Sequence, residues 1–206
     1  MHHDQMPRFA PITAEGVVEL VADRAARMTG RGVVAVDGAD AADPLALARA
    51  VADDLRARGR SADVVWLHDY VRPASLRLEY GRDEMTYRTA WFDYAGLERE
   101  VLQALRERGR WLPALWDERT DRSARATTVS AAPDAVLFVA GPMLLGRGLD
   151  FDLSVELHMS EGALRRTTDP AAEFTIDALL SHRADRTTEP DILIAWDHPN
   201  RPAVRI

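Results

Sequence analysis

The stretch that decides the fold is Gly32-Val33-Val34-Ala35-Val36-Asp37-Gly38-Ala39-Asp40-Ala41-Ala42-Asp43-Pro44-Leu45. Its apolar, β-branched start lies between glycines, which predicts a buried strand over 33–36. A helical pattern follows from Leu45, with an apolar face formed by Leu47, Ala48, Val51, Ala52 and Leu55. A strand, a loop of small residues and a helix in this order are typical of a phosphate-binding loop.

The motif that defines such a loop is G-x-x-x-x-G-K-[ST]. If Gly38 is its first glycine, Asp43 stands at the second glycine and Pro44 at the lysine. Leu45 then stands at the hydroxyl residue. Every chemically active position of the motif is therefore replaced.

The replacements disfavour a bound phosphate for a physical reason. Such a loop holds an anion through free backbone N–H groups and the helix dipole. Asp43 is a good N-cap and Pro44 a good first helical residue, so the Asp43 carboxylate can take the place of the anion. Pro44 also removes one N–H donor, and Asp40 adds negative charge. We therefore favour an ordinary capped turn at 38–45 over a phosphate-binding role.

Composition narrows the class of protein. The chain has 206 residues, 47% of them hydrophobic, which suits one domain with a substantial core. The net charge of -7 argues against a nucleic-acid surface. All 26 basic residues are arginine, so no lysine can replace the missing loop lysine, although arginine can bind phosphate. The absence of cysteine excludes disulfides and thiol catalysis.

The same composition gives expectations about the setting of the protein. Apolar runs are too short to span a membrane and the N-terminus lacks a signal-peptide pattern, so we expect a cytoplasmic protein. The bias toward arginine and alanine suggests a bacterial source with a GC-rich genome.

Further elements follow along the chain. Residues 1–12 look loose, and Thr13 is expected to cap a helix to about 28. Beyond the central stretch we expect strands over 62–67, 135–139, 153–157 and 191–196, helices over 93–108, 160–166 and 173–183, a loop over 74–92, a β-excursion over 110–130 and a hinge-like break over 167–172. Strands that alternate with helices predict an α/β protein, with a mostly parallel sheet and helices on both faces.

The order of these segments resembles the uridine kinase-like nucleoside and nucleotide kinases. The segments that carry the resemblance are 33–38, Leu67-His68-Asp69-Tyr70-Val71-Arg72-Pro73, Tyr80-Gly81-Arg82, Tyr87-Arg88, 92–97, 136–145, 152–157, Arg165-Arg166 and 189–194. The resemblance implies a three-layer P-loop kinase-like fold over 31–206, preceded by a tail and helix over 1–30. It also implies a lid-like segment at about 165–173.

Three departures from the family pattern bear on function. The phosphate loop lacks Gly-Lys-Ser/Thr, Ala140 replaces the acid before Gly141, and His68 replaces the first acid of an Asp-Asp-Phe segment. Phosphoryl transfer depends on positioning and charge neutralisation by such groups. Their joint loss suggests that the chemistry is gone, so we expect no metal site and no cofactor.

Asp69 is the best remaining candidate for a catalytic base, because it follows the end of a predicted strand. The alternative alignment makes His68 the base. A structural role for Asp69, as a loop cap or in an ion pair with Arg72, is equally open.

The resemblance also implies a set of substrate-binding residues. They are Tyr70, Arg72, Tyr80, Arg82, Tyr87, Arg88, Phe92 and Asp93. Four aromatic side chains can stack on a nucleobase, those of Tyr80, Tyr87, Trp91 and Phe92, but packing under a long loop is favoured. Arg82 and Arg88 can hold a phosphate or sugar, or lie solvated at the surface. In the family Arg165 and Arg166 would stabilise transferred phosphate, and otherwise they end a helix favourably.

Two hypotheses follow. The first is a pseudo-kinase that has lost ATP·Mg²⁺ chemistry and binds a nucleoside, another small molecule or a protein partner. The second is a divergent ATP-dependent nucleoside kinase that uses Asp69 as base and arginines in place of the loop lysine. Members of the family often form oligomers, so a homo-oligomer is among the expectations, whereas nucleic acid and membrane are not expected partners.

Overall fold

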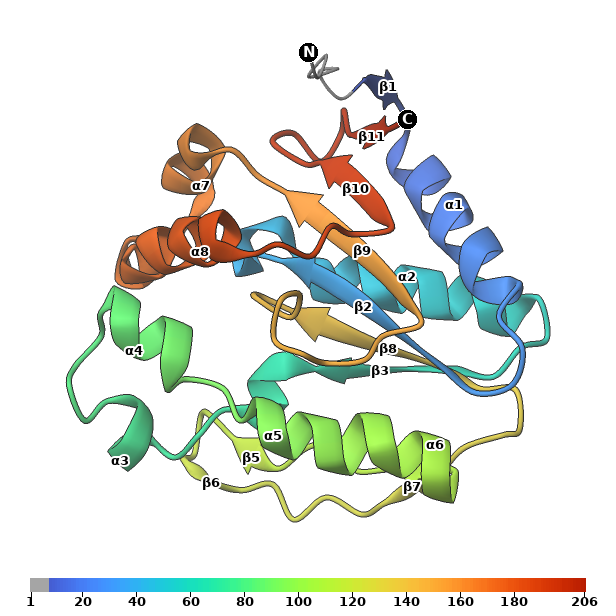
Figure 1. Ribbon diagram of the computed structural model, residues 1–206, viewed down its shortest axis with the longest axis horizontal. Coiled ribbons are helices and arrows are strands. Elements are labelled where there is room, and N and C mark those ends of the chain that lie inside the picture. The colour runs from blue at the N-terminus through green and yellow to red at the C-terminus, as the bar shows by residue number, and fades with distance from the viewer. Residues whose placement is uncertain (1–7) are drawn as a thin grey trace.

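The computed structural model describes residues 8–206, which form a seven-stranded sheet of order β1-β11-β10-β9-β2-β8-β3 (Figure 1). Its strands are β1 Phe9–Pro11, β2 Gly32–Gly38, β3 Ala62–Trp66, β8 Val136–Gly141, β9 Leu153–His158, β10 Ile192–Ala195 and β11 Ala203–Arg205. The five strands from β10 to β3 run parallel, and β11 and β1 add an antiparallel edge. The predicted mostly parallel sheet is confirmed.

Helices cover both faces of this sheet. They are α1 Ala14–Ala26, α2 Pro44–Ala57, α3 Ala74–Arg77, α4 Glu84–Thr89, α5 Tyr94–Leu97, α6 Ala104–Arg108, α7 Glu161–Thr167 and α8 Phe174–Asp185. A π-helical segment, Glu98–Gln103, joins α5 to α6, so the helix predicted over 93–108 is continuous. In Figure 1, α1 and α2 lie on one side of the sheet and α5 and α6 on the other.

Successive side chains of β2 point to opposite faces of the sheet and belong to two separate core clusters. Val34 and Val36 of β2 point into the cluster that contains the buried faces of α1 and α2. Val33 and Ala35 point into the opposite cluster, with the inward residues of α5 and α6. The central strand is fully buried because both of its faces are covered, as its unbroken apolar run predicts. Since α1 shares a core with α2, the N-terminal helix packs on the domain predicted over 31–206.

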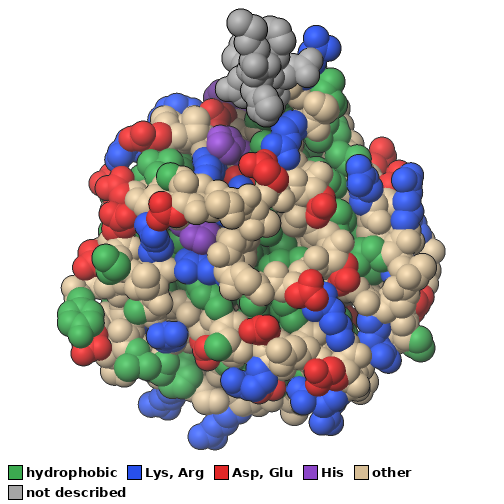
Figure 2. Space-filling model, in the orientation of Figure 1, with side chains coloured by type: hydrophobic (Ala, Val, Ile, Leu, Met, Phe, Trp, Pro, Cys, Tyr) green, Lys and Arg blue, Asp and Glu red, His purple; other side chains and the backbone are tan. Residues whose placement is uncertain are grey.

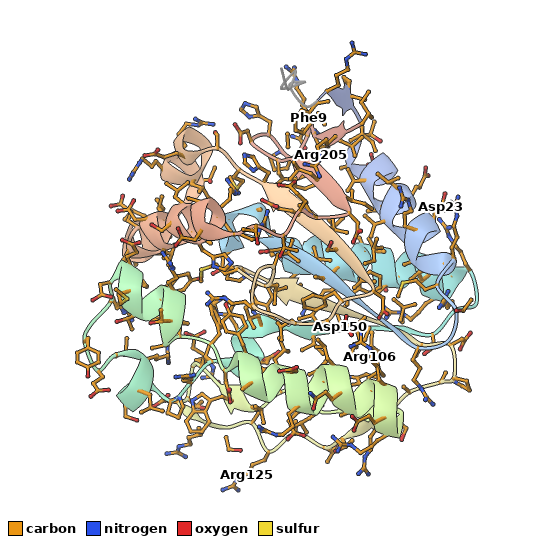
Figure 3. The ribbon with its side chains drawn as sticks, viewed as in Figure 1. Phe9, Asp23, Arg106, Arg125, Asp150 and Arg205 are labelled. Atoms are coloured by element: carbon orange, nitrogen blue, oxygen red, sulfur yellow. The ribbon has the colours of Figure 1, made fainter. Side chains whose placement is uncertain are left out.

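Two expectations about local structure are wrong. Residues 9–11, expected to be loose, form β1, which pairs with β11 so that Phe9 lies opposite Arg205 (Figure 3). The loop expected over 74–92 contains α3 and α4, and the Asp83 side chain caps α4 through the Thr86 amide. Very short elements depend on their tertiary partners, so their local sequence carries little signal. The rest of the predicted loose segment, residues 1–7, lies outside the described residues.

The β-excursion predicted over 110–130 is confirmed as two small hairpin-like pairs. Strand β4 (Arg110–Trp111) pairs with β7 (Val129–Ser130), and β5 (Trp116–Asp117) pairs with β6 (Arg122–Ser123). Within residues 8–206, none of the helices combines the length and apolarity needed to cross a membrane.

Candidate functional site

The loop between β2 and α2 is a closed turn. A short 3-10 turn spans Asp40–Ala42, and two backbone amides at its end are used within the loop. The Ala42 amide donates to the Ala39 carbonyl at 2.8 Å, and the Asp43 amide donates to the Asp40 carbonyl at 3.0 Å. These N–H groups are therefore not directed at a ligand, as those of an anion-binding loop would be.

Asp43 completes the closure. Its Oδ1 accepts a hydrogen bond from the Ala46 amide at 3.1 Å, and Pro44 is the first residue of α2. The predicted N-cap and first helical residue are confirmed. The Asp43 backbone has φ of 50°, in the left-handed region that favours glycine. This conformation supports the alignment of Asp43 with the second glycine of the motif.

A series of ion pairs links this loop to the end of β3. His68, in the 3-10 turn Leu67–Tyr70, places Nε2 at 3.1 Å from both Asp40 carboxylate oxygens. Its Nδ1 lies 2.9 Å from Glu118, and Glu118 also accepts a hydrogen bond from Arg77 at 2.7 Å. Asp40, which lies in the turn where a phosphate would bind, is thus paired with the His68 side chain.

The two carboxylates keep His68 charged. Burial alone would lower the pKa of His68, but the hydrogen bonds to Asp40 and Glu118 outweigh burial and raise the pKa to about 10. Trp66 also stacks on the imidazole, with ring centroids 4.8 Å apart. An imidazolium with both nitrogens engaged by carboxylates is a poor general base, so this geometry does not favour His68 in that role.

Asp69 lies beside a groove of about 480 Å³. The groove is lined by Trp66, His68, Asp69, Trp116, Asp117, Glu118, Arg119, Ser123 and Ala124. Burial raises the pKa of Asp69, and the nearby Asp117 charge adds to the effect. Among residues 8–206 the Asp69 carboxylate has no hydrogen bond or ion pair, so the proposed pair with Arg72 does not form. Its oxygens remain able to accept a hydrogen bond from a ligand.

The predicted aromatic binders divide by burial. Tyr70, Tyr87 and Phe92 are core residues, and the Tyr70 hydroxyl donates to the Leu112 carbonyl at 2.5 Å. Tyr87, Trp91 and Phe92 pack on one another and on Phe174, which agrees with the packing alternative. Tyr80 is 79% exposed, so it alone of the four stacking candidates has a free face.

The predicted polar binders are also placed by their contacts. Asp93 caps α5 through the Gly96 amide at 2.9 Å. Arg88 pairs with Asp185 of α8 at 2.5 Å. Arg72 and Arg82 have no ion pair within residues 8–206, and their role in substrate binding stays a prediction.

The lid-like arginines end a helix, as the alternative for them supposes. Arg165 lies in the last turn of α7, where it pairs with Glu161 at 2.8 Å and with Asp177 of α8 at 3.3 Å. The exposed Arg166 side chain follows it in the same turn. Residues 167–172 contain the 3-10 turn Pro170–Ala172, so the predicted break between α7 and α8 is confirmed.

Sequence analysis missed a buried charge cluster at the carboxyl ends of β2 and β9. Asp37 and Glu156 are 6% and 3% exposed, and Arg186 contacts both, at 3.8 Å and 2.5 Å. Arg183 adds a contact to Glu156 at 3.3 Å. The signal was an acid at an inward position of each apolar strand, which is unusual unless the acid is paired.

This cluster bounds a cavity beside Gly38 and Ala39 of only about 30 Å³. That volume suits an ordered water and is too small for a phosphate group. Burial raises the pKa of Asp37 to about 6, against the hydrogen bond donated by the Leu145 amide. Burial would also raise the pKa of Glu156, but its contacts with His158, Arg186 and Arg183 outweigh burial and lower the pKa to about 2.

The residues present do not fit an ATP·Mg²⁺ complex. Pro44 and Leu45 supply neither an ammonium group for the phosphates nor a hydroxyl for the metal ion. Ala140, buried at the end of β8, supplies no carboxylate. Among residues 8–206 no three His, Asp or Glu side chains are grouped to hold a metal ion.

Several solved structures share this arrangement at low sequence identity. A possible uridine kinase from Bacillus stearothermophilus is 18% identical, with a TM-score of 0.67 over 87% of this chain and 97% of its own. A proposed fructose transport system kinase from Silicibacter sp. TM1040 is 22% identical, with a TM-score of 0.68 over 88% of this chain and 98% of its own.

The fold is that of the uridine kinase-like P-loop kinases. A D-glycerate 3-kinase from Cryptococcus neoformans extends the likeness, at 15% identity and a TM-score of 0.53 over 86% of this chain and 81% of its own. Neither protein-family models nor curated protein sequences give a match. The predicted three-layer P-loop kinase-like fold is confirmed.

Proposed function

We propose that this chain is a pseudo-kinase: a P-loop kinase-like domain that does not transfer phosphate from ATP and that binds a small hydroxyl-bearing molecule, such as a nucleoside, in the groove beside Asp69. The observation that carries the proposal is the closed loop. The Ala42 and Asp43 amides donate to carbonyls of the loop itself, and the Asp43 carboxylate caps α2 where a phosphate would lie.

The charge around the loop supports the same conclusion. Asp40 and Asp43 place two carboxylates in the turn, and the nearest cation, His68, is already shared between Asp40 and Glu118. A triphosphate placed here would meet the charges of Asp40 and Asp43 and would compete with Asp40 for His68.

The groove supports the second half of the proposal. Its volume, about 480 Å³, lies within the range of small-molecule sites, roughly 300–1,000 Å³. Asp69 offers free acceptor oxygens, while Trp66 and Trp116 add apolar surface to the wall. The carboxylates of Asp69, Asp117 and Glu118 line the groove against the single arginine Arg119 and the already paired His68, so the groove favours a neutral, hydroxylated ligand over a phosphorylated one.

Isothermal titration with ATP and Mg²⁺, followed by uridine and cytidine alone, tests both halves. We expect no heat from ATP·Mg²⁺ and saturable binding of a nucleoside that Asp69→Asn abolishes. The matched control is the triple variant D43G/P44K/L45S, which restores the motif residues and should gain ATP binding. Tight binding of ATP·Mg²⁺ by the wild-type protein would contradict the proposal.

A divergent nucleoside kinase is the second candidate, and one observation favours it. Arg183 and Arg186 line the cavity beside Gly38, so a guanidinium group lies near the loop. Both arginines are engaged by Glu156, which makes them unavailable to a phosphate unless the cluster opens. Transfer of phosphate from ATP to any of a nucleoside panel, lost in Arg186→Gln, would establish this candidate. The cytoplasmic setting, the bacterial source and a homo-oligomeric state remain predictions.

A further inference from the structure

A second cavity, away from the loop, is rich in arginine. It has a volume of about 320 Å³ and lies between the π-helical segment, α6 and the β4–β7 pair. Its lining residues are Arg99, Glu100, Ala104, Arg108, Arg110, Trp111, Leu112 and Thr128. We propose that this cavity binds the phosphate group of a small phosphorylated metabolite.

The charges in the cavity are unbalanced toward the positive. Arg99 donates to the one acid present, Glu100, at 2.8 Å. Arg108 and Arg110 have no acidic partner within residues 8–206, and Arg108 makes only a long hydrogen bond to the Arg99 carbonyl at 3.5 Å. Two guanidinium groups are therefore uncommitted here, in a chain whose net charge is -7.

A neighbouring arginine that points away from the cavity does find acidic partners. Arg106, on the same helix, pairs with Asp150 at 3.3 Å and with Asp152 at 3.1 Å, and Figure 3 shows Arg106 beside Asp150. Along the edge of the molecule formed by these elements, Figure 2 shows basic side chains interspersed with acidic ones. The two arginines of α6 thus differ, since Arg106 is paired and Arg108, which lines the cavity, is not.

Helix stabilisation does not account for all of the charge. Arg106 and Arg108 lie in the last turn of α6, where cations favour the dipole. Arg110 lies beyond the helix end, which is marked by Gly109 at φ of 62°, and it belongs to β4. A separate reason is needed for an uncommitted guanidinium group at that position.

The backbone around the cavity is fixed by several contacts. The Leu112 amide donates to the Glu100 carbonyl of the π-helical segment at 3.0 Å, and the Ala131 amide donates to the Gly109 carbonyl at 2.8 Å. Single π-helical turns inside α-helices are frequent at functional sites, because they redirect side chains and free a carbonyl. The pairing of Trp111 with Val129 brings Thr128 and its hydroxyl to the cavity wall.

These groups match the chemistry of a phosphate. Guanidinium groups present forked N–H donors that suit phosphate oxygens, and a threonine hydroxyl adds one donor. The cavity is larger than a phosphate group, so it leaves room for the organic part of a small metabolite. The site is independent of the proposed function, since the loop and groove lie at the ends of β2 and β3.

Titration with inorganic pyrophosphate at low ionic strength, followed by amide shifts in a ¹⁵N-labelled sample, tests the assignment. We expect saturable shifts confined to residues 99–112 and 128–130, weakened about tenfold by Arg110→Gln and further by R108Q/R110Q. The control R24Q/R27Q removes the same charge from α1 and should leave the affinity unchanged. Added salt should weaken binding, as expected for exposed charges.

Three results would overturn the proposal. They are the absence of saturable shifts, equal weakening in R108Q/R110Q and R24Q/R27Q, and shifts centred on residues 38–46. The last result would also count against the closed loop, so the two proposals fail in distinguishable ways. If R108Q/R110Q does not fold, as judged by circular dichroism, the single variant Arg110→Gln carries the test.

Discussion

The ends of β2 and β3, which lie on either side of β8 in the sheet, have opposite characters. At the end of β2 the polar groups satisfy one another: loop amides bind loop carbonyls, Asp43 caps α2, and Asp40 binds His68. At the end of β3 the Asp69 carboxylate faces an open groove without a partner. In a P-loop kinase the first region would hold phosphates and the second a hydroxylated substrate. Under the proposed function, a two-part site has kept its open half and closed the other.

The largest expected effect comes from the buried cluster behind the closed loop. Glu156→Gln removes the closer of the two carboxylates on the buried Arg186 and leaves only Asp37 at 3.8 Å, so we expect a loss of about 3–5 kcal/mol in the free energy of unfolding, measured by urea denaturation. The control is Glu161→Gln, which removes an exposed pair with Arg165 and should cost less than about 1 kcal/mol. Equal effects of the two substitutions would show that the cluster does not stabilise this strand end.

The second-largest effect concerns His68, which follows β3 and pairs with Asp40 in the loop after β2. The pKa of His68 is raised from 6.5 to about 10, so its contribution to stability is fully present below pH 6.5 and is lost as the pH rises through 10. We expect about 3 kcal/mol from this source, because partial solvation reduces the interaction below the about 5 kcal/mol that the shift alone implies.

The variant His68→Gln isolates that contribution. Buried tyrosines such as Tyr70, whose pKa is also raised, destabilise the wild type and the variant alike at alkaline pH. The difference between their free energies of unfolding should therefore be near its maximum below pH 6.5 and shrink toward pH 10. A difference that does not change with pH would contradict an imidazolium held by Asp40 and Glu118.

At acidic pH, Glu156 and Asp37 change the free energy of unfolding in opposite directions. The pKa of Glu156 is lowered from 4.5 to about 2, so its stabilisation is present above pH 4.5 and lost as the pH falls through 2. The pKa of Asp37 is raised from 3.8 to about 6, so its cost is present above pH 6 and relieved as the pH falls toward 3.8. Together with His68, these groups place the stability maximum between about pH 4.5 and 6.5, which a series of denaturation curves would check.

The elements of these regions differ in how far the sequence predicts them. The apolar run of β2, the periodic face of α2 and the cap at Asp43 are local features, and each is confirmed. The partner of His68 is 50 residues away, at Glu118, in a hairpin whose strands have two residues each. Contacts of that kind depend on packing that no local pattern carries.

The same distinction explains the other corrections. The short strands β1 and β11 pair only because the ends of the described chain meet at one edge of the sheet. The sequence predicts only that Asp37 and Glu156 lie in strands. Their common partner, Arg186, is far from both in the sequence and reaches them only in the folded chain. The aromatic residues of the segment 80–92 were ambiguous between ligand and core, and three-dimensional burial separates them.

A smaller effect tests the closure of the loop itself. Asp43→Ala removes the cap and places alanine at φ of 50°, so we expect a loss of about 1.5 kcal/mol. Asp43→Gly also removes the carboxylate but relieves the backbone, and it should change stability by less than about 0.5 kcal/mol.

The N-cap of α1 gives the matched control. Thr13 caps α1 from an extended backbone, with φ of -84°, so Thr13→Ala should cost only the cap, about 1 kcal/mol. The excess of Asp43→Ala over Thr13→Ala then measures the strain at position 43. If Asp43→Gly is as costly as Asp43→Ala, the left-handed conformation does not explain the preference at this position.

The smallest expected effect on stability is at the open strand end. Asp69 gains nothing from a partner in the described chain, and burial disfavours its charged form, which raises its pKa. Asp69→Asn keeps the shape and removes the charge, so the free energy of unfolding at pH 7 should stay within about 0.5 kcal/mol of the wild type or rise slightly. Loss of nucleoside binding in the same variant would separate function from stability at this residue. A clear destabilisation would instead mean that Asp69 holds the fold together, and the contrast between a closed strand end and an open one would then disappear.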